Sequence, residues 1–248
     1  MKKTGLFLTP FILLGLLVAL PSAQAEPVAM DEKELSQFIE QYLMNNPSVL
    51  VNALDNAQKY INDENERRQL SLLKSKSKDL FNDKRDFSIG PADAKINVVE
   101  FFDYNCGYCK RALPDLKKLI ENNDDIRVTF KEMPILGPSS QQAAQIALTA
   151  KSDAEYFEIH REILEIRGSI SPARLEQIAE KYEINDMASK NKRSSSLILK
   201  HLEDTRALAQ SLEISGTPAF IINDTILPGA VPYERLQNEI DNIRKMLN

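Results

Sequence analysis

The chain has 248 residues, of which 43% are hydrophobic and 27% are charged, and its formal net charge is −5. This length suits one sizeable domain with an appendage, and the acidic balance disfavours binding to nucleic acid or to anionic lipid. Only two cysteines are present, too few for a small secreted fold that disulfides hold together.

The first residues have the three parts of a secretory signal peptide. Two lysines precede an apolar stretch from Leu6 to Leu20, and Ala23-Gln24-Ala25 supplies small residues at a cleavage site. A membrane anchor is the less favoured alternative, because the apolar run is short for a span and contains a proline and a glycine. We therefore predict that residues 1–25 are removed and that the rest is exported as a soluble protein to the bacterial periplasm.

Residues 26–84 are predicted to form a helical arm. Asp31 and Glu34 have the spacing of a capping box, and apolar residues then recur at helical intervals as far as Phe81. Asn46-Pro47 marks a break between two helices. An amphipathic helix must bury its apolar stripe, either on its own downstream domain or on the same segment of another chain. We favour the second partner, which predicts a homodimer or homotrimer built through residues 30–81.

Turn-forming residues between Asn82 and Lys95 place a domain boundary near Lys84, so that residues 85–248 form the main domain. Strands are predicted at Ile96–Tyr104, Ile126–Phe130, Ala219–Ile222 and Thr225–Leu227, and helices after Cys106, over about residues 139–212 and over Tyr233–Leu247. The order strand, helix, strand, helical block, strand, strand, helix indicates an α/β fold with an inserted helical region.

Cys106-Gly107-Tyr108-Cys109 lies where a buried strand ends and a helix begins. The free N–H groups and the dipole of a helix N-terminus stabilise an anion, so Cys106 should ionise more readily than an ordinary thiol. A thiolate is the nucleophile of disulfide exchange, and Cys109 lies one turn later, where it can attack a mixed disulfide. The motif predicts redox chemistry.

Other uses of the two cysteines are less favoured. A structural zinc site needs four ligands, and the chain has only two histidines, His160 and His201, far away in sequence. We interpret both as surface or helix-packing residues. A c-type haem would need a histidine where Lys110 stands. A structural disulfide would close too small a loop to stabilise the chain much. We predict no metal and no cofactor beyond a redox-active Cys106–Cys109 disulfide.

The residues from Val98 to Asn105 that lead into the cysteine pair, and the later Ser215–Phe220 segment, resemble the DsbA family of thiol:disulfide interchange proteins in the thioredoxin superfamily. The resemblance covers about residues 86–248. It implies a thioredoxin fold with a helical insertion, Cys106 as nucleophile, Cys109 as resolving cysteine, and Thr217-Pro218 as a cis-proline loop beside them. Thr217, Pro218, Gly107 and Tyr108 are the substrate-binding residues predicted on this basis.

Glu100 is an acid inside an otherwise apolar strand. A buried carboxyl group has a raised pKa and can carry protons near neutrality, and the resemblance places Glu100 at the family's proton-shuttle acid. The alternative is a glutamate exposed at a sheet edge.

Two departures bear on the type of activity. The dipeptide between the cysteines is Gly-Tyr rather than Pro-His, which removes a histidine that could stabilise the thiolate, and Thr217 is a choice seen in disulfide isomerases. The arm resembles those of the oligomeric Com1/ScsC-like type of the family.

Together these features predict an enzyme that forms or isomerises disulfides in exported proteins. Its expected partners are unfolded or misdisulfided exported proteins and a membrane redox partner of the DsbB or DsbD type. The alternative is a non-catalytic periplasmic chaperone on the same fold. The basic cluster at residues 190–193 is expected to be solvated.

Overall fold

The structure is a computed structural model that describes residues 31–184 and 195–247. The predicted signal peptide and the basic cluster at residues 190–193 lie outside the described residues. The contacts divide the chain into two compact units, the first ending at Gln58 and the second beginning at Lys59.

The first unit contains helix α1 (Glu32–Asn45) and the beginning of helix α2 (Pro47–Phe81). The Asp31 carboxylate accepts a hydrogen bond from the backbone N–H of Glu34 at 2.8 Å, so the predicted cap is confirmed. The predicted break at Asn46-Pro47 is confirmed as well. Helix α1 buries none of its residues. Large apolar side chains are exposed along this unit: Leu35, Phe38, Ile39, Tyr42, Met44, Val49, Leu50, Val51 and Leu54.

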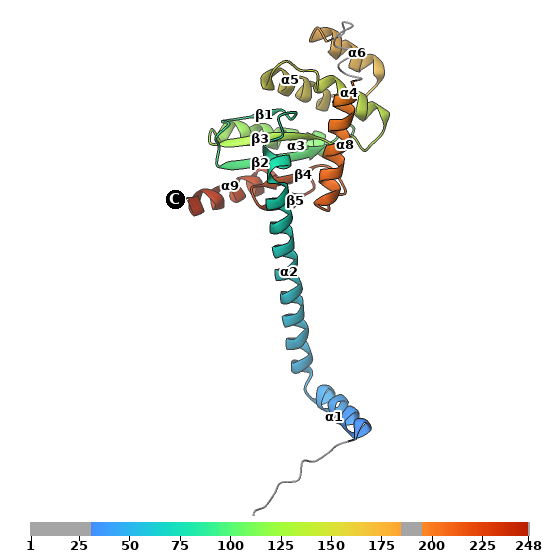
Figure 1. The fold of residues 1–248 in the computed structure, drawn as a ribbon, viewed down its shortest axis with the longest axis vertical. Helices are drawn as coiled ribbons and strands as arrows, with labels where there is room; N and C mark the ends of the chain where they lie inside the picture. The colour runs from blue at the N-terminus through green and yellow to red at the C-terminus, as the bar shows by residue number, and fades with distance from the viewer. Residues whose placement is uncertain (1–30, 185–194, 248) are drawn as a thin grey trace, which may run out of the picture. The chain divides into compact units, whose positions relative to one another are not determined.

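The second unit is built on a five-stranded sheet with the order β1-β3-β2-β4-β5 (Figure 1). The strands are β1 (Ser88–Ile89), β2 (Ile96–Phe102), β3 (Ile126–Glu132), β4 (Ala219–Ile222) and β5 (Thr225–Pro228). Strands β2 and β3 are parallel, and the other pairs are antiparallel. The sequence did not predict β1, because two residues are too few to show a pattern. Strand β2 ends two residues earlier than predicted and β3 two residues later.

Besides the end of α2, the described part of this unit contains the helices α3 (Gly107–Asn122), α4 (Pro138–Ala147), α5 (Asp153–Leu164), α6 (Pro172–Lys181), α8 (Ser196–Ser211) and α9 (Tyr233–Leu247). Helices α4, α5, α6 and α8 correspond to the predicted helical block. Helix α3 lies between the parallel strands β2 and β3 in the chain, and β4, β5 and α9 complete the sheet and its cover (Figure 1). The fold is the predicted thioredoxin fold with inserted helices.

Each face of the sheet carries its own core. On the side that we call the α3 face, the even-numbered residues of β2 and β3 pack with α3, α5 and α9. On the opposite side, the α8 face, Val99 and Phe101 of β2 pack with Leu208 of α8 and with Leu73 and Leu80 of α2. Burial of alternate residues on both faces explains why β2 is almost continuously apolar.

The packing of Leu73 and Leu80 joins the end of α2 to the domain. Both leucines are at most 2% exposed, and the second unit therefore begins at Lys59 rather than near Lys84, where turn-forming residues had suggested a boundary. Of the two partners considered for the apolar stripe, this part of α2 contacts its own domain.

The α8 face also buries a cluster of charged groups. The side chains of Lys131 and Asp86 are 1% and 2% exposed and form an ion pair. The Lys131 ammonium also donates to the backbone carbonyl of Asp79 near the end of α2. His201 of α8 approaches the same aspartate, with Nε2 3.1 Å from Oδ1. His201 is 3% exposed. Of the two environments predicted for it, the surface and helix packing, it therefore occupies the second.

Candidate active site

Cys106 and Cys109 lie at the amino-terminal end of α3, directly after β2. Cys106 is the N-cap residue of α3 and has extended backbone geometry. Its carbonyl accepts from the backbone N–H of Lys110 at 3.1 Å, the first bond of the helix. Both cysteines are free thiols in this structure. Cys106 retains 6% exposure and Cys109 has none, so an incoming sulfur atom can reach only Cys106.

The environment of Cys106 favours the thiolate. The pKa of Cys106 is lowered to about 5, most strongly by a hydrogen bond from the Cys109 thiol, while burial acts in the opposite direction. The backbone N–H groups of Tyr108 and Cys109 also lower this pKa, as the N-terminus of a helix does for an anion. Near neutral pH the Cys106 sulfur is therefore mainly ionised.

Cys109 has the opposite preference. Its pKa is raised well above the usual thiol range, first by burial, then by its hydrogen bond to Cys106 and by the neighbouring charge of Glu100. Cys109 therefore remains protonated while Cys106 is ionised. At neutral pH the motif therefore holds one thiolate and one thiol.

Glu100 lies in β2 between β3 and β4 and is 1% exposed, which excludes the alternative of an edge residue. Its pKa is raised to about 8, first by burial, then by the charges of Glu132 and Cys106. Its Oε2 atom has no hydrogen-bond partner among the described residues. A carboxyl group of this kind can hold a proton at pH 7 and exchange it near Cys109.

A second buried acid, Glu132, was missed by the sequence analysis. Its Oε1 atom accepts hydrogen bonds from the hydroxyls of Tyr104 and Tyr156, both at 2.8 Å. Its pKa is raised to about 8, mainly by burial, although the two tyrosines act against this shift. Glu132 lies opposite Phe102 in the β2–β3 ladder, on the same face as Glu100. A longer predicted β3 would have revealed it, because Glu132 then alternates with Val128 and Phe130 and falls on the same buried face of the strand.

His160 belongs to this buried cluster. Burial lowers its pKa to about 3, so the imidazole is neutral. Its Nδ1 atom lies 3.3 Å from the Tyr104 hydroxyl. Because Tyr104 already donates its single proton to Glu132, the bond requires Nδ1–H of His160 as the donor. The bonds therefore run in one direction, from His160 through Tyr104 to Glu132.

The Thr217-Pro218 peptide bond is cis, as expected from the resemblance. The Cys106 thiol, when protonated, donates to the Thr217 carbonyl at 3.1 Å. The Pro218 carbonyl accepts from the backbone N–H of Gly229 at 2.9 Å, which holds the loop against the end of β5. The structure thus brings the Cys106–Cys109 pair beside Thr217-Pro218, although more than a hundred residues separate the cysteines from this loop in the chain.

The dipeptide between the cysteines is open to solvent. Gly107 is exposed and Tyr108 is 60% exposed. The Tyr108 ring lies under the guanidinium of Arg111, 4.2 Å from the ring centroid. An exposed aromatic side chain beside a nucleophilic sulfur can contact a bound polypeptide.

Asp103 anchors the loop that precedes Cys106. It is a second residue, after Glu132, whose role the sequence did not reveal. Its Oδ1 accepts from the backbone N–H of Asn105 and the hydroxyl of Ser140, each at 2.7 Å. Its Oδ2 accepts from the backbone N–H groups of Ile135 and Leu136, at 2.8 and 2.9 Å. A single carboxylate therefore joins the cysteine loop to the segment between β3 and α4.

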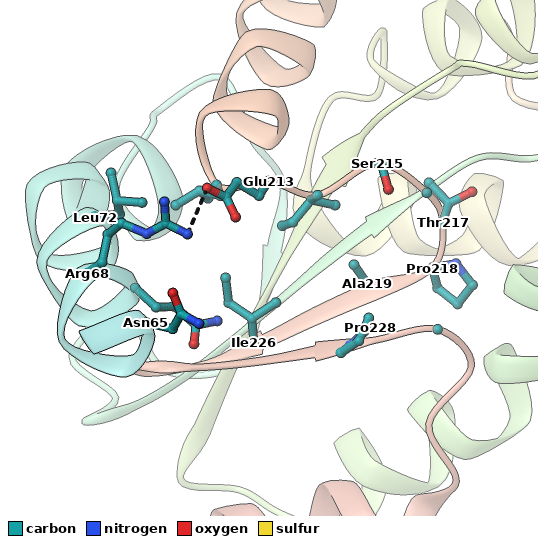
Figure 2. A pocket seen from close by; sticks show the side chains of 15 residues that line it. Asn65, Arg68, Leu72, Glu213, Ser215, Thr217, Pro218, Ala219, Ile226 and Pro228 are labelled. Carbon is teal, nitrogen blue, oxygen red and sulfur yellow. Dashed lines mark ion pairs between the residues drawn. The ribbon is translucent and has the colours of Figure 1, made fainter. Parts of the chain in front are cut away.

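A groove leads away from the Thr217-Pro218 loop (Figure 2). Its floor includes Ala219 of β4 and Ile226 of β5, and the segment from Glu213 to Thr217 forms one side. The groove ends at α2, where Arg68 faces Glu213.

Among the helices that the structure describes, none is long and apolar enough to cross a membrane.

Comparisons with known proteins place these features in a family context. The family described as "DSBA-like thioredoxin domain" matches residues 97–241, which include both cysteines and the cis-proline loop. Among curated proteins, Na(+)/H(+) antiporter NhaA 1 from Salinispora arenicola is 29% identical over 163 residues. The match covers 61% of this chain and 24% of the antiporter, so the chain spans about a quarter of the length of that relative.

Two solved structures are similar over much of the chain. A linker-deletion mutant of ScsC from Proteus mirabilis is 33% identical, with a TM-score of 0.65, covering 89% of this chain and 98% of that one. The thiol-disulfide exchange protein alpha-DsbA2 from Wolbachia pipientis is 26% identical, with a TM-score of 0.66, covering 73% of this chain and 98% of that one.

Proposed function

Because the chain belongs to the DSBA-like thioredoxin domain family, a family of oxidoreductases, we propose that it exchanges disulfides with exported proteins through Cys106 and Cys109. The observation that carries this proposal is the opposite ionisation of the two sulfurs in one motif: the pKa of Cys106 is lowered to about 5, and that of Cys109 is raised. A purely structural disulfide needs no such division.

The oxidising cycle begins with the Cys106–Cys109 disulfide. A substrate thiolate attacks Cys106 Sγ, the Cys106–Cys109 bond breaks, and Cys109 leaves and takes up a proton. Glu100, whose pKa is raised to about 8, is the group that supplies this proton. A second substrate thiolate then attacks the substrate sulfur of the mixed disulfide, and Cys106 departs as a stabilised thiolate. The substrate gains a disulfide, and the protein is left as the dithiol.

The reverse sequence reduces or isomerises a substrate disulfide. The Cys106 thiolate attacks a substrate sulfur and releases the other one. Cys109 then gives its proton to the Glu100 carboxylate and attacks Cys106 Sγ, which frees the substrate. Thr217, Pro218, Gly107 and Tyr108 form the surface around Cys106 that receives the substrate, and the backbone of the cis-proline loop is available for strand-like pairing.

The cellular setting follows from the same proposal. Residues 1–25 direct export to the periplasm and are removed. The exposed apolar side chains of residues 31–58 pair with the same segment of another chain, giving a homodimer or homotrimer. A membrane protein of the DsbB or DsbD type restores the working redox state, and no metal or separate cofactor takes part.

The equilibrium reduction potential of the cysteine pair, measured in glutathione buffers by thiol alkylation, tests the activity. A value between about −120 and −230 mV is expected for a catalytic dithiol. A value below roughly −300 mV, typical of structural disulfides, would contradict the proposal and favour a non-catalytic chaperone.

Two variants separate the roles of the sulfurs. Cys109→Ala should accumulate a mixed disulfide between Cys106 and substrate, whereas Cys106→Ala should form none. If Cys106→Ala instead retains full activity in a thiol-independent aggregation assay, the chaperone alternative gains support.

A further inference from the structure

The groove beside the cis-proline loop is closed at one end by the arm helix α2. It encloses about 570 Å³ and extends continuously from Thr217 and Pro218 to Asn65, Arg68, Gln69 and Leu72 of α2 (Figure 2). Its floor is apolar, with Ala219 and Ile226, and its rim is polar, which is the usual anatomy of a site for a polypeptide.

The α2 residues at this end carry amide groups that the fold does not use. Asn65 and Gln69 are four residues apart and share one face of the helix. Neither side chain has a hydrogen-bond partner among the described residues. An amide side chain offers both donors and an acceptor, which is the complement of an extended peptide backbone.

The third polar residue of this end is already paired, but weakly. Arg68 lies 3.3 Å from Glu213, and their side chains are 61% and 66% exposed. An exposed ion pair of this kind contributes little to stability, so a bound chain can displace it at small cost. The Arg68–Glu213 pair is therefore a side of the groove that a bound chain can move, not a fixed wall.

The position of the groove defines what can occupy it. Thr217 and Pro218 line it, and the Thr217 carbonyl is 3.1 Å from Cys106 Sγ. A substrate bonded to Cys106 therefore has its neighbouring residues at the mouth of the groove. The groove begins beside Cys106, so the chain that can enter it is the unfolded polypeptide that flanks the reacting cysteine of the substrate.

We propose that the groove binds an extended, unfolded segment of the substrate protein beside its reacting cysteine, with Asn65 and Gln69 of α2 holding the main chain and the apolar floor taking one apolar side chain. The inference rests on the proposed function. It makes the arm helix part of the substrate site. Amide contacts to the main chain tolerate many sequences, which suits an enzyme with varied unfolded substrates.

The test compares two disulfide substrates on the full-length protein. One is glutathione disulfide, which carries no polypeptide beyond its tripeptide units, and the other is a disulfide-linked peptide with apolar residues on both sides of its cysteine. Gln69→Trp fills the groove, and Ser71→Trp adds the same ring on another face of α2, where Ser71 is exposed. Asn65→Ala with Gln69→Ala removes the two amides without adding bulk.

The proposal expects both groove variants to raise KM for the peptide about tenfold, the effect of losing one or two hydrogen bonds and their packing. Exchange with glutathione disulfide should be unchanged, and Ser71→Trp should match the wild type in both assays. Unchanged peptide kinetics in the groove variants would overturn the inference. So would an equal loss with both substrates, or a change in solution mass, which would assign the groove to a second copy of the chain.

The failure of the proposed function has a different signature. If the wild-type protein exchanges with neither glutathione disulfide nor the peptide, the thiol–disulfide activity itself is absent, whatever the groove variants do.

Discussion

The two faces of the central sheet bury charged groups in different ways. On the α8 face, Lys131 is paired with Asp86 and bonded to the end of α2. On the α3 face, Glu100 and Glu132 lie among aromatic side chains, and the pKa of each is raised to about 8, mainly by burial. Adjacent residues of one strand, Lys131 and Glu132, point to these two environments.

The difference separates a structural use of charge from a chemical one. A buried pair whose charges satisfy each other holds elements together, and its ionisation does not need to change. An acid whose pKa is raised by burial to a value near neutral pH can exchange protons at working pH. The α8 face therefore fixes α2 and α8 on the sheet, and the α3 face supports the cysteines.

Breaking the pair on the α8 face should give the largest loss of stability. Asp86→Ala leaves the Lys131 ammonium buried without its partner, and a loss of about 3–5 kcal/mol in the free energy of unfolding is expected. Urea unfolding of the full-length protein measures it. A loss below about 1 kcal/mol would show that the cluster is open to water.

The acids on the α3 face predict a dependence of stability on pH with the opposite sign from that of a paired carboxylate. Where the folded pKa of Glu100 is about 8 and the unfolded value is near 4.5, the folded state binds more protons between these values. The contribution of Glu100 to stability should therefore fall as pH rises from about 4.5 to 8, by up to about 1.4 kcal/mol per pH unit.

The Glu100→Gln variant checks the source of this slope. It cannot ionise, so its stability between pH 5 and 8 should decline less steeply than that of the wild type. It should also slow the step in which Cys109 gains or loses its proton. An unchanged slope would indicate that another group titrates in this range.

Glu132 should tune Glu100 through its charge. The neighbouring Glu132 charge raises the pKa of Glu100, so Glu132→Gln should move the pH midpoint of the exchange rate downward, by about one unit as the two acids titrate together. Stopped-flow exchange across pH 5–9 measures the shift. Tyr156→Phe removes one donor to the Glu132 carboxylate and should favour its neutral form, shifting the midpoint in the same direction by less.

The smallest effect is expected for the Arg85 ion pairs on the α8 side, whose side chains are partly exposed. Arg85 bonds to Asp83 and lowers the pKa of that carboxyl to about 2, and it also reaches Asp204 at 2.8 Å. Because solvent screens these groups, Arg85→Ala should cost less than about 1 kcal/mol. A loss as large as that of Asp86→Ala would remove the distinction between buried and exposed pairs.

Much of this arrangement could be predicted from the sequence, because its signals are local. The cap at Asp31, the break at Asn46-Pro47 and the cysteine motif after an apolar strand each depend on residues close together in the chain. The cis peptide bond before Pro218 was predicted from the resemblance to the DsbA family.

The remaining features depend on contacts between distant residues. Glu132 joins the buried cluster only through Tyr104 and Tyr156, and Asn65 and Gln69 of α2 line the groove only through the fold of the Glu213–Thr217 segment. The position of the domain boundary depended on the burial of Leu73 and Leu80, because the helical periodicity of α2 is the same whether its stripe packs on the sheet or on another chain.

The carboxylate of Asp103 has a consequence for the disulfide exchange proposed at the cysteines. Three of its four hydrogen bonds come from backbone N–H groups on both sides of the cysteine loop, so we expect this backbone to keep its position when the disulfide closes or opens. The two states should therefore superpose along the whole segment from Asp103 to Ser140, and neither should have to wait for the chain to rearrange.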